Sequence, residues 1–399
     1  MTNKLINKYF LLFVVILFSF ENVPAQSLLQ QVLQRIEANN KTLKAAQQLA
    51  EVQRIDAKTD IYPSDVKVGY EHVFGNGAAS YQDEKELTIV QDFDFPTAYF
   101  QKNKMANIKS NQADVEYCVV RQDILLETKI ICIELVYLNK NRVRIEHLLE
   151  NTGRLAESYQ KQLEIGDVNV LEANKIALEF LNIKNESRMN DAEIANRLRK
   201  LAGLNGGEYV GFSDTIYLEP DFSMLYDDML QKSLEADLQL KTLEQEKDIA
   251  SKSVGLAKSM ALPKFSVGYK MVVSNPERFN GFIAGLSIPL WENKNTIKRE
   301  KAKEILAGLK MDDMRTFRIS EFKQMFDKAM TLKQSYERYK ELLFAQNNWN
   351  YLSKSLSLGQ ISLHEYLIEM NFLYQSAENY LQIERDYHLI MAELLKTEL

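Results

Sequence analysis

The chain has 399 residues, of which 46% are hydrophobic and 26% are charged, and its formal net charge is −6. A protein that binds nucleic acid needs a basic surface to meet the phosphate backbone, so this excess of acid argues against a nucleic-acid partner. The whole chain contains 7 prolines and 15 glycines. Because these two residue types interrupt helices, their scarcity predicts a chain built mostly of long helices.

Residues 1–25 have the pattern of a secretory signal peptide. Lys4 and Lys8 precede an apolar run over residues 9–20, and Ala25 supplies a small residue for cleavage. A run of about 12 apolar residues is too short to span a bilayer, which takes about 20. We therefore expect the mature chain to be exported. No cysteine directly follows the apolar run, so a lipid anchor at the new N-terminus is not expected.

The first predicted repeat covers residues 26–202 and opens with a helix and a β-hairpin. Residues 27–59 carry apolar side chains at helical spacing. Residues 62–97 alternate as strands do, in the segments VKVGYEHVF and ELTIVQDFDFP. The second segment places four apolar residues on one face: Leu87, Ile89, Phe93 and Phe95.

Two more helices complete this repeat. Residues 98–165 contain no proline and predict a helix about 100 Å long at 1.5 Å per residue, and residues 167–202 predict a shorter one. Gly166 separates the two helices, at a turn that calls for a positive φ. Because a helix of that length needs partners along all of it, we expect the two shorter helices to lie end to end against it.

Residues 203–223 form a glycine-rich connector. We predict a short strand over residues 209–217 and expect the connector to lie against the middle of the helical body.

Residues 224–399 show the same order of elements. A helix over residues 227–260 leads to a hairpin over residues 262–291, and helices over residues 293–358 and 360–396 follow. The apolar face of the second hairpin includes Val267, Tyr269, Phe282, Leu286 and Ile288.

Matching positions indicate that the two halves arose by duplication. Pro96 and Pro289 each end a strand segment, Gly166 and Gly359 each separate two helices, and the members of both pairs lie 193 residues apart. The helix lengths then predict an antiparallel helical cylinder, with both glycine turns at one end and all strands at the other.

The strand segments alternate as those of a transmembrane β-barrel do, with apolar residues on one face and small or polar residues on the other. Four strands cannot close a barrel, and an open edge in lipid leaves backbone groups unpaired at several kcal/mol each. The sheet is therefore predicted to close with other chains, with its apolar face toward lipid. The alternative is a soluble sheet packed on the helices.

An ordered set of motifs resembles the TolC-like outer-membrane efflux proteins over essentially the whole mature chain. The motifs are FDFPTAY, IPLWENKN, LPKFSVGY, EIGDVNVLEAN and SLGQISLHEYL. The resemblance implies a mainly α fold with a small β part, in which long helical hairpins form an α-barrel and four strands per chain complete a trimeric twelve-stranded barrel. It also implies a homotrimer that extends from the outer membrane into the periplasm, where it meets a periplasmic adaptor and an inner-membrane pump.

The function implied is passive conduction of a substrate from the pump to the exterior. No enzymatic activity, cofactor or metal is expected, because the four histidines lack ligand spacing and no catalytic or nucleotide-binding motif is present: His72, His147, His364 and His388. The alternative is a periplasmic adaptor or a structural coiled-coil protein. An adaptor has one helical hairpin, whereas two are predicted here. The transported substrate stays open among drugs, metal ions, peptides and proteins.

Two kinds of functional residue follow from this resemblance. The adaptor is expected to contact the two helix turns, which consist of eight residues: Ile165, Gly166, Asp167, Val168, Leu358, Gly359, Gln360 and Ile361. Glu172 and Glu365 stand six residues beyond the turn glycines, where three copies of either would form an acidic ring that favours cations. The resemblance supports Glu365 more than Glu172 as the pore aperture. The alternative is that each glutamate stabilises the positive end of its own helix.

Overall fold

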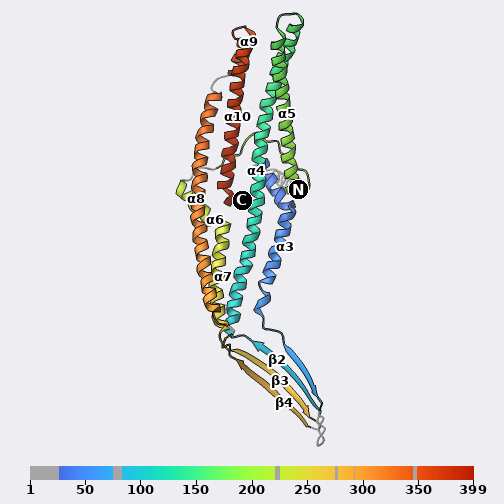
Figure 1. Cartoon of the computed structure of the whole chain (residues 1–399), viewed down its shortest axis with the longest axis vertical. Coiled ribbons are helices and arrows are strands. Elements are labelled where there is room, and N and C mark those ends of the chain that lie inside the picture. The colour runs from blue at the N-terminus through green and yellow to red at the C-terminus, as the bar shows by residue number, and fades with distance from the viewer. Residues whose placement is uncertain (1–26, 75–82, 221–224, 275–276, 292, 345–347) are drawn as a thin grey trace, which may run out of the picture.

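The computed structural model describes residues 27–74, 83–220, 225–274, 277–291, 293–344 and 348–399. The predicted signal peptide, residues 1–25, lies outside the described residues. The molecule is long and narrow, with a helical body and a sheet that projects from one end (Figure 1). No described helix combines the length and the apolarity that crossing a membrane requires.

The first half contains one helix that runs the full length of the body. Helices α2 (Leu28–Asn39) and α3 (Lys41–Asp56) and the short helix η1 (Thr59–Ile61) lead to the sheet. Helix α4 (Pro96–Glu164) then returns from the sheet to the far end, and α5 (Val170–Leu204) comes back to the middle (Figure 1). Proline occupies the first turn of α4, where its missing N–H costs no hydrogen bond.

The second half follows the same course. Helices α6 (Tyr226–Ala236) and α7 (Leu238–Met260) lead to the sheet, and α8 (Thr296–Phe344) leaves it. Helices α9 (Asn348–Ser357) and α10 (Leu363–Leu394) and the short helix η2 (Lys396–Glu398) complete the chain. The sequence predicted one helix over residues 293–358, whereas the structure gives α8 and α9, and residues 345–347 between them lie outside the described part.

The single helices predicted over residues 27–59 and 227–260 are wrong, because each is broken within its length. Asn40 and Asp237, which lie 197 residues apart, have extended backbones with ψ of 124° and 113°. Asn40 Oδ1 accepts a hydrogen bond from the N–H of Leu43 at 2.9 Å, and Asp237 Oδ1 accepts two from the start of α7. Each side chain therefore caps a new helix, and the two halves bend at equivalent positions.

The four strands form one antiparallel sheet in the order β1 (Lys67–Val73), β2 (Glu84–Phe93), β3 (Lys264–Ser274) and β4 (Glu277–Ser287). The two hairpins join where β2 pairs with β3, with Ile89 opposite Tyr269. The sheet is therefore built by both halves of the chain, and β1 and β4 are its edges.

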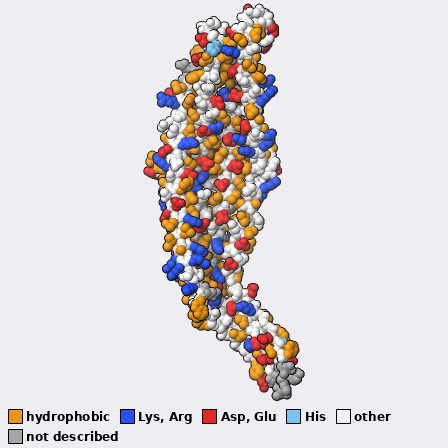
Figure 2. All heavy atoms as spheres, in the orientation of Figure 1, with side chains coloured by type: hydrophobic (Ala, Val, Ile, Leu, Met, Phe, Trp, Pro, Cys, Tyr) orange, Lys and Arg blue, Asp and Glu red, His pale blue; other side chains and the backbone are white. Residues whose placement is uncertain are grey.

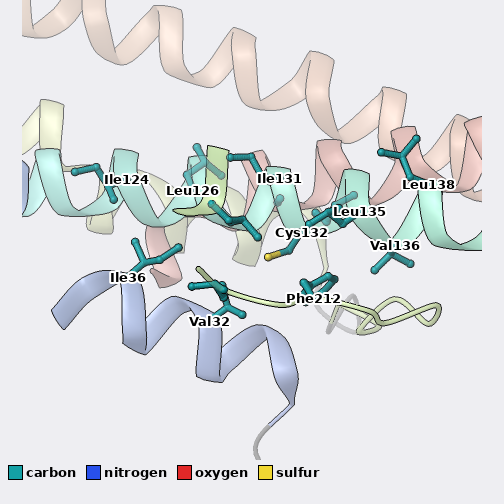
Figure 3. Close-up of a cluster of buried hydrophobic side chains, with 14 of the residues drawn as sticks. Val32, Ile36, Ile124, Leu126, Ile131, Cys132, Leu135, Val136, Leu138 and Phe212 are labelled. Carbon is teal, nitrogen blue, oxygen red and sulfur yellow. The ribbon is translucent and has the colours of Figure 1, made fainter. Parts of the chain in front are cut away.

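The connector lies against the middle of the body, as expected, but the strand predicted over residues 209–217 is wrong. These residues have no ladder partner among the described strands, and side chains hold them instead. Val210, Phe212 and Tyr217 are buried, and Asn139 Nδ2 of α4 donates to the carbonyl of Asp214 at 3.1 Å. Phe212 belongs to the largest cluster of buried apolar side chains, and Figure 3 shows it between α2 and α4.

Candidate functional site

The register places the predicted apolar residues of the strands on one face of the sheet. Directly opposed residues in an antiparallel pair share a face, and Ile89, Tyr269 and Phe282 are opposed in one row across β2, β3 and β4. Alternation along the strands adds the others: Leu87, Phe93, Val267 and Leu286. Phe95 and Ile288 lie just beyond the strand ends. This face is uncovered within the described chain, and Phe282 is 92% exposed.

The opposite face mixes small and polar residues with four apolar ones: Val90, Val272, Phe279 and Ile283. Thr88 is opposed to Lys270, and Lys270 Nζ lies 2.6 Å from a carboxylate oxygen of Glu86. Gly268 has no room for a side chain, because a Cβ there would lie 2.4 Å from the carbonyl oxygen of Ile89. The sheet therefore has the two unlike faces of a barrel wall, which separates lipid from an aqueous lumen.

The sheet stands apart from the helical body. Figure 1 shows no helix over either face, and β1 and β4 each pair on one side alone within the described strands. An uncovered apolar face and two open edges are unfavourable for an isolated soluble sheet. The alternative of a soluble sheet packed on the helices is therefore wrong for the described structure.

The two predicted turns lie together at the far end of the body. Gly166 and Gly359 have φ of 80° and 67°, which L side chains rarely adopt. The N–H groups of Gly166 and Asp167 bond carbonyls of α4 at 3.1 and 2.8 Å, and those of Gly359 and Gln360 bond carbonyls of α9 at 3.0 and 2.9 Å. Each turn therefore satisfies the last carbonyls of the helix that it ends.

The two helical hairpins pack against each other below these turns. Ile176 of α5 is fully buried against Leu363, Tyr366 and Met370 of α10. The turns themselves are exposed, and Ile165 and Leu358 keep 73% and 61% of their surface. The structure brings the eight predicted docking residues to one end, and their contact with an adaptor stays a prediction.

Glu172 and Glu365 both stand in the first turn of a helix, in a capping box. Asn169 accepts from the N–H of Glu172 at 3.0 Å, and a carboxylate oxygen of Glu172 accepts from the N–H of Asn169 at 3.4 Å. Glu365 accepts from the N–H and the hydroxyl of Ser362 at 2.8 and 2.9 Å. These two bonds, the backbone one first, lower the pKa of Glu365. Both glutamates thus cap their own helices, as the alternative interpretation requires. Their role at a pore aperture stays a prediction.

A buried polar group in the middle of the body was not predicted from the sequence. Lys140 Nζ of α4 lies 2.6 Å from Glu384 of α10, and the hydroxyl of Tyr380 donates to the same carboxylate at 3.1 Å. The ring of His388 stacks on Tyr217 of the connector at 4.1 Å. Burial, followed by the charges of nearby lysines, lowers the pKa of His388 to about 3, so this histidine is neutral at physiological pH. The group ties the two halves and the connector together.

The sequence does contain a signal for this group. Tyr380, Glu384 and His388 recur every four residues and so share one face of α10. Lys140 lies 244 residues from Glu384, however, and no local pattern links the two. Among the described residues, no group of His, Cys, Asp and Glu side chains is arranged to hold a metal ion.

No protein-family model and no curated protein matches the chain. Solved structures do match over nearly all of it. CusC, described with the conformational changes accompanying folding and transmembrane channel formation, has a TM-score of 0.76 at 14% identity, and the match covers 94% of this chain and 92% of CusC. The Campylobacter jejuni CmeC outer membrane channel has a TM-score of 0.72 at 14% identity, with 93% and 85% covered.

The outer membrane protein VceC of Vibrio cholerae has a TM-score of 0.74 at 12% identity, and the match covers 92% of this chain and 95% of VceC. Likeness at such low identity shows a common fold. The resemblance to TolC-like outer-membrane efflux proteins is therefore confirmed at the level of the fold, as is the predicted class of long helical hairpins with a small four-stranded sheet.

Proposed function

We propose that the chain is the outer-membrane channel of a tripartite efflux or secretion system and that it conducts its substrate passively. The observation that carries this proposal is the sheet, which has one exposed apolar face, one more polar face and two open edges beyond the end of a helical body. A closed barrel in lipid is the arrangement that satisfies all three features. The likeness in fold to outer-membrane channels supports it.

A homotrimer would close both the sheet and the helical body. Each chain has β1 at one edge of the sheet and β4 at the other, and contacts among the helices place α3 and α8 at the corresponding edges of the body. Copies that meet head to tail, with unlike edges in contact, form a ring. Three copies would supply the twelve strands of the barrel that the sequence resemblance implies.

The remaining parts of the proposal concern location and partners. The sheet would lie in the outer membrane, and the helical body would extend into the periplasm with its glycine turns toward the inner membrane. A periplasmic adaptor would contact those turns and link the channel to an inner-membrane pump. The sequence contains no nucleotide-binding loop, so the pump would supply the energy.

Conductance of the purified protein in a planar lipid bilayer tests the proposal. The oligomer extracted from the outer membrane with detergent is expected to give stepwise, long-lived conductance and to migrate on a gel as a heat-sensitive trimer. A chain that leaves the cell envelope without detergent, stays monomeric and gives no conductance would show that the proposal is wrong.

A further inference from the structure

The two lateral edges of the helical body carry opposite charge near the sheet. The edge made by the end of α3 and by η1, called the acidic edge here, exposes Asp56 and Asp60, with one exposed lysine, Lys58, between them. The basic edge, made by the start of α8 and the residues before it, exposes Lys294 and Lys298. Figure 2 shows Lys and Arg side chains gathered on the helical body close to the sheet. Within the described part of the chain, none of these four side chains forms an ion pair.

The charged residues lie at matching separations along the chain from the edge strands. Asp60 and Asp56 lie 7 and 11 residues before Lys67, where β1 begins. Lys294 and Lys298 lie 7 and 11 residues after Ser287, where β4 ends. If β1 of one copy pairs antiparallel with β4 of the next, the two segments leave the shared sheet side by side, and the opposite charges reach the same level.

Each edge also carries an apolar stripe farther from the sheet. Leu49, Val52 and Ile55 of α3 are 56%, 45% and 58% exposed, while Leu43 and Ala50 on its other side are buried. Ile305, Leu306 and Leu309 of α8 are 66%, 52% and 62% exposed. A surface helix normally exposes a polar face, so an exposed apolar stripe indicates a surface that a partner covers. Here the two helices with such a stripe, α3 and α8, lie at the two edges of the body.

We propose that the acidic edge of one copy docks on the basic edge of the next, with Asp56 and Asp60 facing Lys294 and Lys298 of the neighbouring copy beside an apolar seam. The inference rests on the proposed channel and goes beyond it, because it names the residues that set the direction of assembly. Like edges repel each other, so two copies cannot meet through the same edge. Every copy then joins the ring in the same orientation, which a closed barrel requires.

Reversal of charge on each edge tests this proposed contact between the acidic and basic edges, which is called the seam from here on. The full mature chain is refolded from denaturant into detergent micelles at low salt, and trimer formation is followed on native gels. The variant Lys294→Glu/Lys298→Glu and the variant Asp56→Lys/Asp60→Lys are each expected to assemble about tenfold more slowly, since complementary charge acts mostly on association rate. All four substitutions together restore attraction with the signs exchanged and are expected to return the rate to near that of the unchanged chain.

The control is Lys241→Glu/Lys247→Glu, which makes the same change of charge on exposed residues of α7. This helix lies at neither edge of the helical body. It is expected to leave the rate unchanged. Helix content by circular dichroism, measured for every variant, separates a fault in folding from a fault in assembly.

Two other results would overturn the seam. One is a variant with all four substitutions that forms trimer as slowly as the two double variants do. The other is a defect of Lys294→Glu/Lys298→Glu that is seen when anionic phospholipid is added to the micelles and is absent without it, which would assign the basic edge to lipid head groups. Unchanged assembly of all variants would refute the seam alone, whereas failure of the unchanged chain to form any trimer would refute the proposed channel.

Discussion

The two ends of the molecule differ in how much of their backbone is hydrogen-bonded, and how much of their apolar surface is covered, within one chain. At the turn end, both glycine turns bond the last carbonyls of their helices, both following helices have capping boxes, and Ile176 packs one hairpin onto the other. At the sheet end, an apolar face and two strand edges remain open. The backbone at the turn end is therefore satisfied within one chain, although Ile165 and Leu358 stay exposed there, whereas the sheet end leaves backbone groups as well as apolar surface open.

This difference assigns separate tasks to the two ends. A surface that is already satisfied can bind and release a partner without unfolding, so the turn end is suited to docking. A surface that is incomplete binds its neighbours permanently, so the sheet end is suited to assembly. Substitutions should therefore produce different defects at the two ends.

The largest effect is expected at the sheet. Ile89 lies near the middle of β2 on the apolar face, and Ile89→Arg should cost about 2–4 kcal/mol per chain if it places a charge near the bilayer midplane. Leu286 is next to the last residue of β4, so Leu286→Arg should cost less, about 0–1 kcal/mol, as expected near an interface. The measurement is the fraction of trimer by sedimentation after detergent extraction.

The matched controls carry the same substitution on the opposite, more polar face. Ile283 is opposed to Gly268 on that face of β4, and Ser287 is opposed to Lys264. Ile283→Arg and Ser287→Arg should retain more trimer than Ile89→Arg. Equal amounts of trimer from both faces would mean that the two faces are not divided between lipid and lumen.

The next largest effect is expected in the helical body, at a contact within one chain that stabilises its fold. Asp237 caps α7 and lies 3.1 Å from Arg318 of α8, and the two side chains are 9% and 12% exposed. Asp237→Ala removes the cap and weakens the pairing of a buried guanidinium, so we expect a loss of about 3 kcal/mol in the free energy of unfolding.

The midpoint of urea unfolding measures this loss. Asp248 is exposed on the same helix, and Asp248→Ala should shift stability by less than about 0.5 kcal/mol. If Asp237→Ala lowered trimer formation and left the unfolding midpoint unchanged, Asp237 would serve contact between copies and not the fold of one chain, and the prediction would be wrong.

Long elements were predictable from the sequence because their signals are local. Scarce prolines and glycines mark the ends of helices, and alternation marks the strands and their faces. The breaks at Asn40 and Asp237 were missed because the apolar stripe continues past them on both sides. Asn and Asp are common helix caps, and their occurrence at equivalent positions of two repeats is the signal that could have identified these breaks.

Contacts between distant parts of the chain could not be predicted in this way. The connector residues 209–217 have the composition of a strand, but α4 supplies their partners through side chains such as Asn139. The pair of Lys140 and Glu384 depends on α4 and α10 lying side by side, which neither segment encodes alone. The same holds for the predicted aperture, since the approach of three copies of Glu365 would depend on assembly of the proposed trimer.

At the turn end, a docking defect is expected without a defect in assembly. A side chain at Gly359 meets nothing within 4 Å, so Gly359→Asp strains the backbone alone, at about 1 kcal/mol for its positive φ. The variant should keep its membrane-inserted trimer and lose export of a fluorescent dye in cells that carry the cognate adaptor and pump. Gly203→Asp, at an equally open position on α5, should keep both. Loss of trimer in Gly359→Asp would show that the turn serves folding and would remove its support as a docking site.

The smallest effect separates the two interpretations of Glu365. A capping box accepts glutamine in place of glutamate, so Glu365→Gln retains the contact with Ser362 and removes the charge. The pKa of Glu365 is lowered from 4.5, so the charged cap stabilises the folded chain above the unfolded value and loses this contribution as the pH falls through the folded value. If three copies line an aperture, single-channel recording of Glu365→Gln at neutral pH should show lower cation selectivity and weaker block by divalent cations, with a smaller change for Glu172→Gln. Selectivity and block that remain unchanged in both variants would leave helix capping as the role of these glutamates.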